Sequence, residues 1–464
     1  MSVRGKDCGA DETDRGVIRY LICDLQGITY RKKKKGCLCF GQPLSVYSTI
    51  QERGRTMSVI KRMKPVFAEL DGGLFSAAQK ADVGDVARKM EEQGVAMMSW
   101  ADPFKPDPST PPEVIEEALK VIQSGTSSHY FMPIGSDELR KLIAQRIERK
   151  CGLKLDPGRN LIINPGSDNG LLFAMFPWIE PGDEVLIHDP SYPNNTLNVK
   201  ILGGIPVAVS TYAEDGWHLR IEEYEKRVTT KTKMVVLTNP NNPTGTSFTR
   251  EELQALADLC IRHDLICIVD QAFEDTVYPE YEMVNMAQIP GMWERTVTVC
   301  SVSKGMGLSG FRVGWTYCDD VIMDKYFASA VSIQGAASTM AQLAVMPAFR
   351  DDSFIEEYRR KYAVRRQYAY DLFNSVPGVS MDMPEAGFYA WINISRLGSS
   401  QEIVQYLIEE AKINCNAGNF FGAQGEGWLR LIYACFWEDQ DAFAAMDRMA
   451  EALRRLAEKK EITG

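Results

Sequence analysis

A lysine in a loop of glycines and serines is the first feature of the sequence that could carry chemistry. Lys304 follows Ser301 and Ser303, and Arg312 stands eight residues beyond it. A lysine amine beside an arginine and hydroxyl groups can bind a phosphate or form a Schiff base with a carbonyl compound. Most lysines are simply solvated, so this loop indicates a site only if other groups join it.

A second polar segment precedes a predicted helix at residues 171–178. Residues 165–170 read Pro-Gly-Ser-Asp-Asn-Gly and include Ser167 and Asp168. Small residues at the start of a helix leave backbone N–H groups free, and together with the positive end of the helix dipole these groups suit a phosphate. An ordinary helix N-cap has the same composition, so both interpretations stay open for this segment alone.

Two more polar signals follow apolar runs. Residues 239–245 read Asn-Pro-Asn-Asn-Pro-Thr-Gly and include Asn242. The two X-Pro bonds predict a rigid turn in which a cis bond is allowed, and a plain turn is the simpler interpretation. Asp270 ends an otherwise apolar run at residues 265–269. A carboxylate at the end of a buried strand has to be solvated at the rim of the sheet or paired with a cation.

The apolar runs before these segments predict the strands of one sheet. Most of them are continuous rather than alternating, as expected for strands buried on both faces. The clearest intervening helix begins with a capping box at Thr249 and Glu252 and ends near His263. This alternation predicts an α/β fold with a mainly parallel, seven-stranded sheet, flanked by helices, whose functional groups lie at the carboxyl ends of the strands. The expected strands are residues 161–164, 184–188, 206–210, 234–238, 265–269, 297–301 and 313–318.

The pattern changes after residue 318. A long helical stretch covers about 321–375, with an interruption near Pro347, and a last helix covers about 439–457. Two or three strands are expected between these helices, at residues 388–394, 413–417 and 429–433. This part predicts a smaller α+β domain. We expect a large domain at residues 106–348, a small domain at 349–464, and an N-terminal segment at 57–105 that packs with the small domain.

Charge limits the class of protein. The chain of 464 residues has a net charge of −10, but residues 1–56 hold 11 Lys and Arg against 6 Asp and Glu, which leaves −15 for the rest. A strongly acidic body argues against a nucleic-acid enzyme. The basic run at residues 31–35 is better explained as a solvated charge run than as a nucleic-acid or membrane patch. The tripeptide Met-Ser-Val occurs both at residues 1–3 and at residues 57–59, and the charge of the chain changes there. We therefore expect residues 1–56 to be a disordered or non-native extension outside the fold.

Hydropathy and cysteine spacing favour a cytoplasmic protein without a metal site. No run of 18 apolar residues occurs, so no membrane span is expected, and the acidic start of the chain argues against secretion. The 11 cysteines are irregularly spaced, and only Cys37 and Cys39 lie close enough to suggest a motif. Without a second pair a zinc site is not expected, and scattered cysteines fit reduced thiols.

Phosphate donors, a carboxylate and a loop lysine together are the groups that a pyridoxal phosphate site requires. With them the sequence resembles the class I and II aminotransferases, a family of fold-type-I pyridoxal phosphate enzymes. The likeness rests on Asn-Pro-Asn-Asn-Pro-Thr-Gly at residues 239–245 and on Ser-Val-Ser-Lys at residues 301–304 with Arg312 beyond it. It extends from about residue 95 to residue 455.

The resemblance implies a role toward the cofactor for each of these residues. Lys304 would form the Schiff base with pyridoxal phosphate and later move a proton between the substrate Cα and the cofactor C4′. Asp270 would keep the pyridine nitrogen protonated. Tyr192 would stack on the ring, and Asn242 would donate to the phenolic oxygen. The phosphate would be held by Ser167, the backbone of Asp168, Ser301, Ser303 and Arg312.

Two further residues concern the substrate and a second subunit. Arg430, in Trp-Leu-Arg-Leu, would bind the substrate α-carboxylate with two parallel hydrogen bonds, next to Asn242. Tyr130, in Ser-His-Tyr followed by Gly135, looks like the tyrosine that reaches the phosphate bound by the partner subunit. The resemblance therefore implies a homodimer with shared active sites, acting on an amino acid and a 2-oxo acid.

The sequence departs from the family pattern at two positions. The family's usual tyrosine three residues after the aspartate is Phe273 here, and its early glycine is Ala101, ahead of Asp102. In addition, members specific for dicarboxylates use an arginine after the phosphate-binding arginine, whereas residues 313–349 contain no arginine and only Lys325. We therefore expect an apolar or aromatic amino donor rather than aspartate, with 2-oxoglutarate as the default acceptor.

Two other functions remain as alternatives. A β-lyase that cleaves C–S bonds would use the same Lys304, Asp270 and Arg430. A regulatory module that senses pyridoxal phosphate would need an N-terminal DNA-binding domain, and residues 1–56 show no convincing helix-turn-helix because Gly and Pro residues interrupt any helical pattern there. An aminotransferase that works by a ping-pong mechanism is the leading interpretation.

Overall fold

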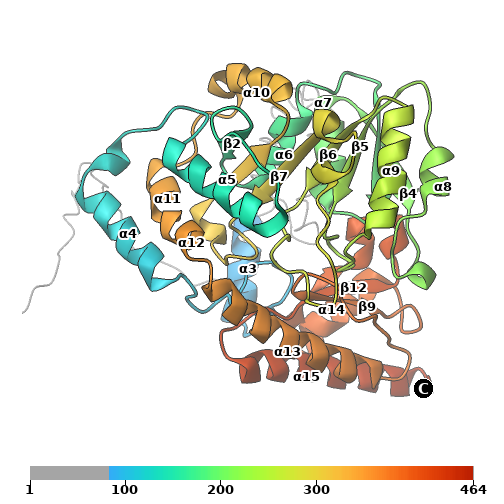
Figure 1. Ribbon diagram of the computed structural model, residues 1–464. Coiled ribbons are helices and arrows are strands. Elements are labelled where there is room, and N and C mark those ends of the chain that lie inside the picture. Colours follow the sequence, from blue (N-terminus) through green and yellow to red (C-terminus); the bar gives the residue numbers. More distant parts are fainter. Residues whose placement is uncertain (1–82, 463–464) are drawn as a thin grey trace, which may run out of the picture. The chain divides into compact units, whose positions relative to one another are not determined.

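The computed structural model describes residues 83–462 (Figure 1). The predictions for residues 1–56, and for the first part of the segment 57–105, therefore lie outside the described residues. None of the helices within residues 83–462 combines the length and the apolar character that a membrane span requires.

All seven predicted strands form one sheet, which confirms the expected fold class. Their order across the sheet is β2-β8-β7-β6-β5-β3-β4. Only β8 runs antiparallel to its neighbours β2 and β7, and the remaining pairs are parallel. The strands are β2 (Leu161–Asn164), β3 (Glu184–Asp189), β4 (Ile205–Ser210), β5 (Thr232–Thr238), β6 (Ile266–Asp270), β7 (Thr296–Ser301) and β8 (Gly314–Tyr317).

Helices cover both faces of this sheet, and the alternation of side chains along the strands determines which face each residue meets. In β5, Val235 and Leu237 pack with the residues of α9, whereas Met234 and Val236 pack on the opposite face with those of α6 and α7. The capping box predicted at the start of α9 is present, with Thr249 and Glu252 bonded to each other's backbone N–H groups. The helices around the sheet are α4 (Pro112–Gln123), α5 (Asp137–Cys151), α6 (Ser167–Met175), α7 (Pro193–Leu202), α8 (Ile221–Glu225) and α9 (Arg250–Arg262).

The long helical stretch predicted after residue 320 is divided more often than expected. It consists of α10 (Asp320–Ile333), α11 (Thr339–Ala344), α12 (Met346–Arg350) and α13 (Phe354–Asn374). The predicted interruption near Pro347 is present, and this proline lies in the first turn of α12, where it needs no hydrogen-bond partner for a backbone N–H. A second break follows α10, where Gly335 has a positive φ of 68°.

A second, smaller group of strands and helices follows. Strands β11 (Asn416–Ala417), β12 (Trp428–Ile432) and β9 (Tyr389–Asn393) form an antiparallel sheet, which α13, α14 (Ser400–Glu410) and α15 (Asp439–Lys459) cover in Figure 1. The run predicted as one strand at residues 413–417 is divided, because β10 (Ile413–Asn414) pairs with β1 (Ala96–Met97) instead. The segment after α3 (Val83–Glu92) thus forms a separate two-stranded sheet with β10. It continues beside β12, where the Ile432 N–H donates to the Met98 carbonyl, and then to the bond from the Phe104 N–H to the Ala434 carbonyl. The domain boundaries stay a prediction.

A buried group of charges lies behind the loop that contains Lys304. Arg146 of α5 is 2% exposed and forms ion pairs with Asp275 at 2.6 Å, Asp352 at 3.0 Å and Glu274 at 3.2 Å. Lys150, one turn further along α5, is 2.6 Å from the same oxygen of Asp275. Burial opposes ionisation of Asp275, but these two cations outweigh it and hold its pKa well below the usual range. The five side chains therefore form a compensated ionic cluster.

We predict that Arg146→Met lowers the free energy of unfolding by about 3 kcal/mol, because removing one partner of a buried ion pair leaves the other charge uncompensated. Urea denaturation measures this change. The control is Arg455→Met, which breaks an exposed pair with Glu451 at 3.3 Å on α15 and should cost at most about 0.5 kcal/mol. Equal losses in the two variants would show that the ionic cluster does not support the fold.

Candidate active site

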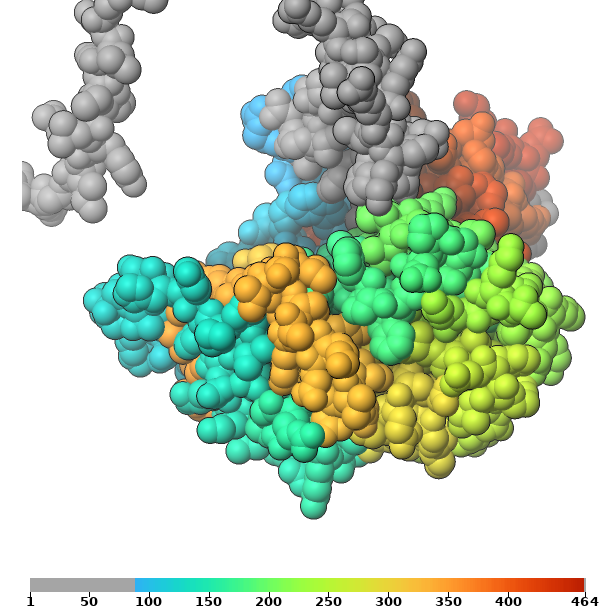
Figure 2. Space-filling view, turned by 90° about the horizontal axis from the view of Figure 1, so that it is seen from above, coloured from blue at the N-terminus to red at the C-terminus, as the bar shows by residue number. Residues whose placement is uncertain are grey.

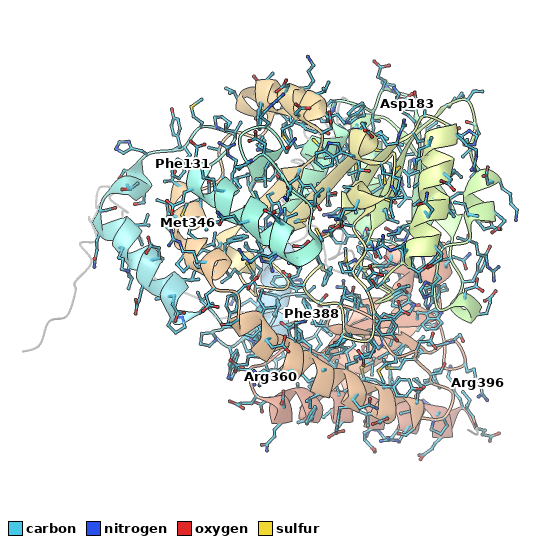
Figure 3. All side chains as sticks on the ribbon, viewed as in Figure 1. Phe131, Asp183, Met346, Arg360, Phe388 and Arg396 are labelled. Carbon is cyan, nitrogen blue, oxygen red and sulfur yellow. The ribbon has the colours of Figure 1, made fainter. Side chains whose placement is uncertain are left out.

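A cavity of about 230 Å³ opens at the carboxyl ends of the central strands and reaches the small sheet. It contains all the side chains predicted from the sequence except Ser301 and Tyr130. Figure 3 shows how side chains fill the space around this region, where Phe388, labelled at the lower centre, packs on the cavity residue Phe273 with 5.4 Å between ring centroids. The lining residues are Ser99, Trp100, Ala101, Asp102, Ser167, Asp168, Tyr192, Asn242, Asp270, Ala272, Phe273, Ser303, Lys304, Ser309, Arg312 and Arg430.

Lys304 lines this cavity. Its Nζ donates to the Ala101 carbonyl at 2.6 Å and lies 6.0 Å from the centroid of the Phe273 ring. Burial lowers the pKa of the ammonium group, and the nearby carboxylates of Asp168 and Asp102 only partly oppose this. A lower pKa increases the fraction of neutral amine, which is the form that attacks a carbonyl carbon.

Asp270 ends β6 and is 5% exposed. Its Oδ1 accepts a bond from the Ala272 N–H at 3.2 Å, and burial raises the pKa of the carboxyl group to about 7. No ion pair among the described residues includes this carboxylate, so its expected pairing with a cation stays a prediction. The site buries a carboxyl group with unused capacity to accept hydrogen bonds, and a cationic N–H donor in the cavity would stabilise its charged form.

Small side chains and backbone groups surround Arg312 at one end of the cavity. Its Nη1 donates to the Ser309 carbonyl at 2.8 Å and to Ser303 Oγ at 3.4 Å, and Ser301 lies behind it, 2.7 Å from Ser303 Oγ. A Cβ atom at Gly166 would lie only 2.3 Å from Arg312 Nη2, so a larger residue there would displace the guanidinium group.

The first turn of α6 reaches the same end of the cavity. Its first residues are Ser167 and Asp168, because the helix begins earlier than the expected residue 171. The free N–H groups of a helix N-terminus beside an arginine form an anion site. This end of the cavity therefore has the donors that a phosphate requires.

A triangle of hydrogen bonds holds the Tyr192 ring. Its hydroxyl donates to Asp168 Oδ1 at 2.9 Å, and Asn194 Nδ2 donates to the same carboxylate oxygen at 3.1 Å. Asn194 Nδ2 also lies 3.1 Å from the Tyr192 hydroxyl. The tyrosine is thus fixed at its polar end while its ring lines the cavity, which suits a planar ligand.

Arg430 lies on β12 at the other end of the cavity and is 3% exposed. It donates to Asn242 Oδ1 at 2.7 Å, to Asn416 Oδ1 at 2.7 Å and to the Ser99 carbonyl at 2.8 Å. Burial lowers the pKa of the guanidinium group to about 10. The Phe421 ring lies 4.7 Å from its charged carbon. All these partners are neutral, so the guanidinium group is held in place but its charge is available to an anion.

Sequence reasoning missed several residues of the site. Asn416 holds Arg430, and Ser309 donates a hydrogen bond to Asp102 in the cavity wall. Ser309 lies in the predicted loop between Lys304 and Arg312, but its type alone did not set it apart from the other small residues there. Asn416 lies in the run predicted as a strand at residues 413–417, and no motif marks it. Ser99 and Trp100 line the cavity because the segment that precedes Asp102 runs along the small sheet.

Tyr130 lies outside the cavity. Its side chain is 90% exposed, and the neighbouring Phe131 is labelled near α4, at the edge of the molecule in Figure 3. This placement brings Tyr130 to none of the other predicted site residues within the chain. Its predicted contact with a partner subunit stays a prediction.

Comparison with known proteins gives the same family as the motifs. The family model for class I and II aminotransferases matches residues 102–446. An aspartate aminotransferase of Pyrococcus abyssi and an aromatic-amino-acid aminotransferase of Thermococcus litoralis are each 33% identical over 354 residues, which is 75% of this chain and 90% of each relative. The crystal structure of an aromatic aminotransferase from Pyrococcus horikoshii superposes with a TM-score of 0.74 at 29% identity, covering 81% of this chain and 100% of that one. The chain therefore belongs to the class I and II aminotransferase family.

Proposed function

We propose that the protein is a pyridoxal-phosphate-dependent aminotransferase, which moves the α-amino group of an amino acid to a 2-oxo acid by a ping-pong mechanism. One observation carries this proposal. The amine of Lys304, with its lowered pKa, lines a cavity that is also lined by Arg312 and Arg430, and no ion pair between the described residues includes either arginine. Two such cations with an amine fit a cofactor phosphate at one position and a substrate carboxylate at the other.

The residues present fit pyridoxal phosphate. Arg312 and the N-terminus of α6 suit its phosphate, Asp270 suits its ring nitrogen, and Tyr192 offers a ring face. Asn242 uses Oδ1 to accept from Arg430, which leaves its amide N–H groups to donate to the phenolic oxygen. When bound, this cofactor supplies an aldehyde that condenses with amines and a ring that accepts the electrons of a bond broken at Cα.

Each residue of the site would have a separate role in the reaction. Arg430 binds and orients the α-carboxylate, so that the Cα–H bond of the substrate points at Lys304. Lys304, as a neutral amine, takes the proton from Cα and returns it at C4′. Asp270, whose buried carboxyl group gains a cationic partner when the site is loaded, keeps the ring nitrogen protonated. Tyr192 and Phe273 exclude water from this proton transfer.

We infer that an apolar or aromatic amino acid is the donor. The cations among the lining residues are Lys304, Arg312 and Arg430, each with a role already, and the wall between them includes Trp100 and Phe273. A second carboxylate on the donor would thus meet no further cation of the described chain. The relatives include proteins named for aspartate and for aromatic amino acids, so direct comparison of donors has to decide.

We also propose that the protein is a homodimer in which Tyr130 reaches the cofactor phosphate of the second subunit. Helix α4 buries Val114 and Val121 against its own chain but exposes Ile115, Leu119 and Ile122 by 47%, 53% and 56%. These three residues form a stripe on one face of the helix. Figure 2 shows the teal surface of the α4–α5 region beside the orange surface of α10 and α11. The exposed apolar stripe of α4, which Tyr130 follows in the chain, supports an interface at this region.

The first prediction from the proposed function concerns Arg430. Arg430→Ala should lower kcat/KM by roughly 30- to 5,000-fold, because losing a desolvated, charge-assisted contact costs about 2–5 kcal/mol. The loss should be similar for alanine, leucine, phenylalanine and aspartate as donors, since all share the α-carboxylate. The control is Arg455→Ala on α15, which should leave kcat/KM unchanged. A loss confined to aspartate would mean that Arg430 binds the side-chain carboxylate of the donor rather than its α-carboxylate.

The second prediction concerns Phe273, which lines the cavity without a hydroxyl group. The nearby Tyr389 hydroxyl donates to the Asn241 carbonyl at 2.8 Å and is thus already engaged. A hydroxyl added by Phe273→Tyr would stabilise the anionic phenolic oxygen of the cofactor. The midpoint pH of the absorbance change in the loaded enzyme should then be about one to two pH units lower than in the wild type. This shift corresponds to the free energy of one hydrogen bond to a charged group.

The measurement for Phe273 is the absorbance spectrum of the bound cofactor between pH 5 and pH 10, taken at roughly half-unit steps. Phe273→Leu is the control, because it removes the ring without adding a donor and should not lower the titration. An unchanged titration in Phe273→Tyr would mean that another donor already serves the phenolic oxygen.

The third prediction concerns the dimer. The double variant Leu119→Asp/Ile122→Asp should raise the dimer dissociation constant at least ~100-fold, because burying carboxylates at an interface costs several kcal/mol. Sedimentation velocity measures the change. Val364→Asp, which places a charge on an apolar residue of α13 that is 51% exposed, is the control. A dimer that survives the double variant would place the interface elsewhere.

A further inference from the structure

A buried histidine, His188, stands four residues before Tyr192 and has no role in the proposed chemistry. His188 is the penultimate residue of β3 and is 1% exposed. The Thr238 N–H points at its Nε2 at 3.0 Å, and the Pro190 carbonyl lies 3.0 Å from its Nδ1. A backbone N–H can only donate, so Nε2 accepts, and the ring proton sits on Nδ1 and is donated to Pro190. Both nitrogens are satisfied when the ring is neutral, and burial lowers the pKa of His188 to about 4.

The two backbone partners of His188 belong to the two segments that carry cavity side chains. Pro190 leads into Tyr192, and Thr238 ends β5 and leads into Asn242. Strands β3 and β5 are parallel neighbours in the sheet, so both segments leave its rim side by side. The imidazole ring is therefore a rigid spacer of fixed length between the loop of Tyr192 and the loop of Asn242.

Further buried hydrogen bonds join the same two loops. Asn241 Nδ2 donates to the Pro190 carbonyl at 3.3 Å, and Asn195 Nδ2 donates to Thr238 Oγ1 at 2.8 Å. The ring plane of His188 is set by an edge-on contact with Phe248, with 5.6 Å between centroids. The imidazole ring of His188 connects the backbone of the two loops: it donates to the Pro190 carbonyl and accepts from the Thr238 N–H. Among the described residues of this network, no other single rigid group does this.

We propose that His188 is a positioning residue, which fixes Tyr192 relative to Asn242 so that the ring face and the phenolic oxygen of the cofactor are met together. This inference rests on the proposed function. An amide side chain could replace only one of the two bonds: asparagine has a donor near the position of Nδ1, and glutamine has an acceptor near the position of Nε2. The two bonds can therefore be removed one at a time.

Three variants of the full-length protein test the proposal. His188→Leu removes both bonds and should raise the dissociation constant of pyridoxal phosphate about tenfold, the size of one unsatisfied buried group. It should also lower kcat about tenfold while KM for the donor changes less, because Arg430 keeps its bonds to Asn416 and Ser99. The dissociation constant is measured by absorbance titration of the apoenzyme, so one readout does not depend on activity.

The two amide variants separate the effects on the two loops. His188→Asn keeps the bond to Pro190 and loses the bond to Thr238. The contact of Asn242 with the phenolic oxygen should then weaken, and the midpoint of the absorbance titration should rise by about half a pH unit or more. The affinity for the cofactor should stay near normal. His188→Gln keeps the bond to Thr238, so it should weaken cofactor binding and leave the titration near that of the wild type. If His188→Leu does not fold, these two variants carry the test.

The control for a general loss of stability is Tyr224→Leu, which alters a fully buried residue of α8. It should lower the melting temperature and leave three readouts unchanged: the dissociation constant of the cofactor, the values of kcat and KM, and the midpoint of the absorbance titration. The proposal is overturned if the His188 variants match Tyr224→Leu in all three readouts, or if both amide variants behave alike. A wild-type protein that binds no pyridoxal phosphate would instead overturn the proposed function itself.

Discussion

Burial of charges without counterions is the constraint on which the rest of this structure depends. Arg430 is almost wholly enclosed and its hydrogen-bond partners are neutral. Asp270 is also buried, whereas Arg312 is exposed, and neither forms an ion pair with the described residues. The amine of Lys304 has a backbone carbonyl as its partner. For the buried Arg430 and Asp270 this condition is costly, because burial disfavours their charged forms unless an opposite charge arrives. A ligand with two anionic groups and a cationic ring nitrogen would compensate Arg312, Arg430 and Asp270.

The contrast with the other buried cations supports this interpretation. Arg146 is paired with three carboxylates, and Arg365, which is fully buried, is bonded to Asp439 at 2.7 Å and to several backbone carbonyls. Both of these arginines lie outside the cavity and connect elements of the fold. These two structural cations are thus compensated by carboxylates of the chain, whereas Arg430, the buried arginine of the cavity, has only neutral partners. This difference separates the site from the scaffold without reference to any relative.

Close packing and buried hydrogen bonds hold the segments around the cavity. Asp275 packs closely against the lysine loop, since a Cβ atom added at Gly305 would lie 2.1 Å from the Cβ of Asp275. The ionic cluster holds Asp275 through Arg146 and Lys150 of α5. On the opposite side, neutral hydrogen bonds through His188 and Asn195 join the loops at the ends of β3 and β5. Fixed donors and charges need no rearrangement when a reaction develops charge, which is the main advantage of a preorganised site.

Much of this arrangement could be predicted from the sequence, because the apolar runs and the strand ends are local signals. The seven strands, the capping box at Thr249 and most cavity residues were predictable in this way. The division of residues 413–417 between two sheets was not, since it depends on pairing with β1. Asn416 and the Ser99 carbonyl, which hold Arg430, are brought in by long-range packing. The lack of an ion pair at Asp270 among the described residues could not be inferred from its position, because neighbours in space are not neighbours in the chain.

The most direct test of the central claim is chemical labelling of the lysine. The full-length protein is loaded with pyridoxal phosphate, reduced with borohydride and digested, and the modified peptide is identified by mass spectrometry. The uncompensated cavity predicts a single labelled residue, Lys304, carrying the reduced cofactor in near-stoichiometric amount. Labelling of a different lysine, or spread over exposed lysines without preference for Lys304, would contradict the account.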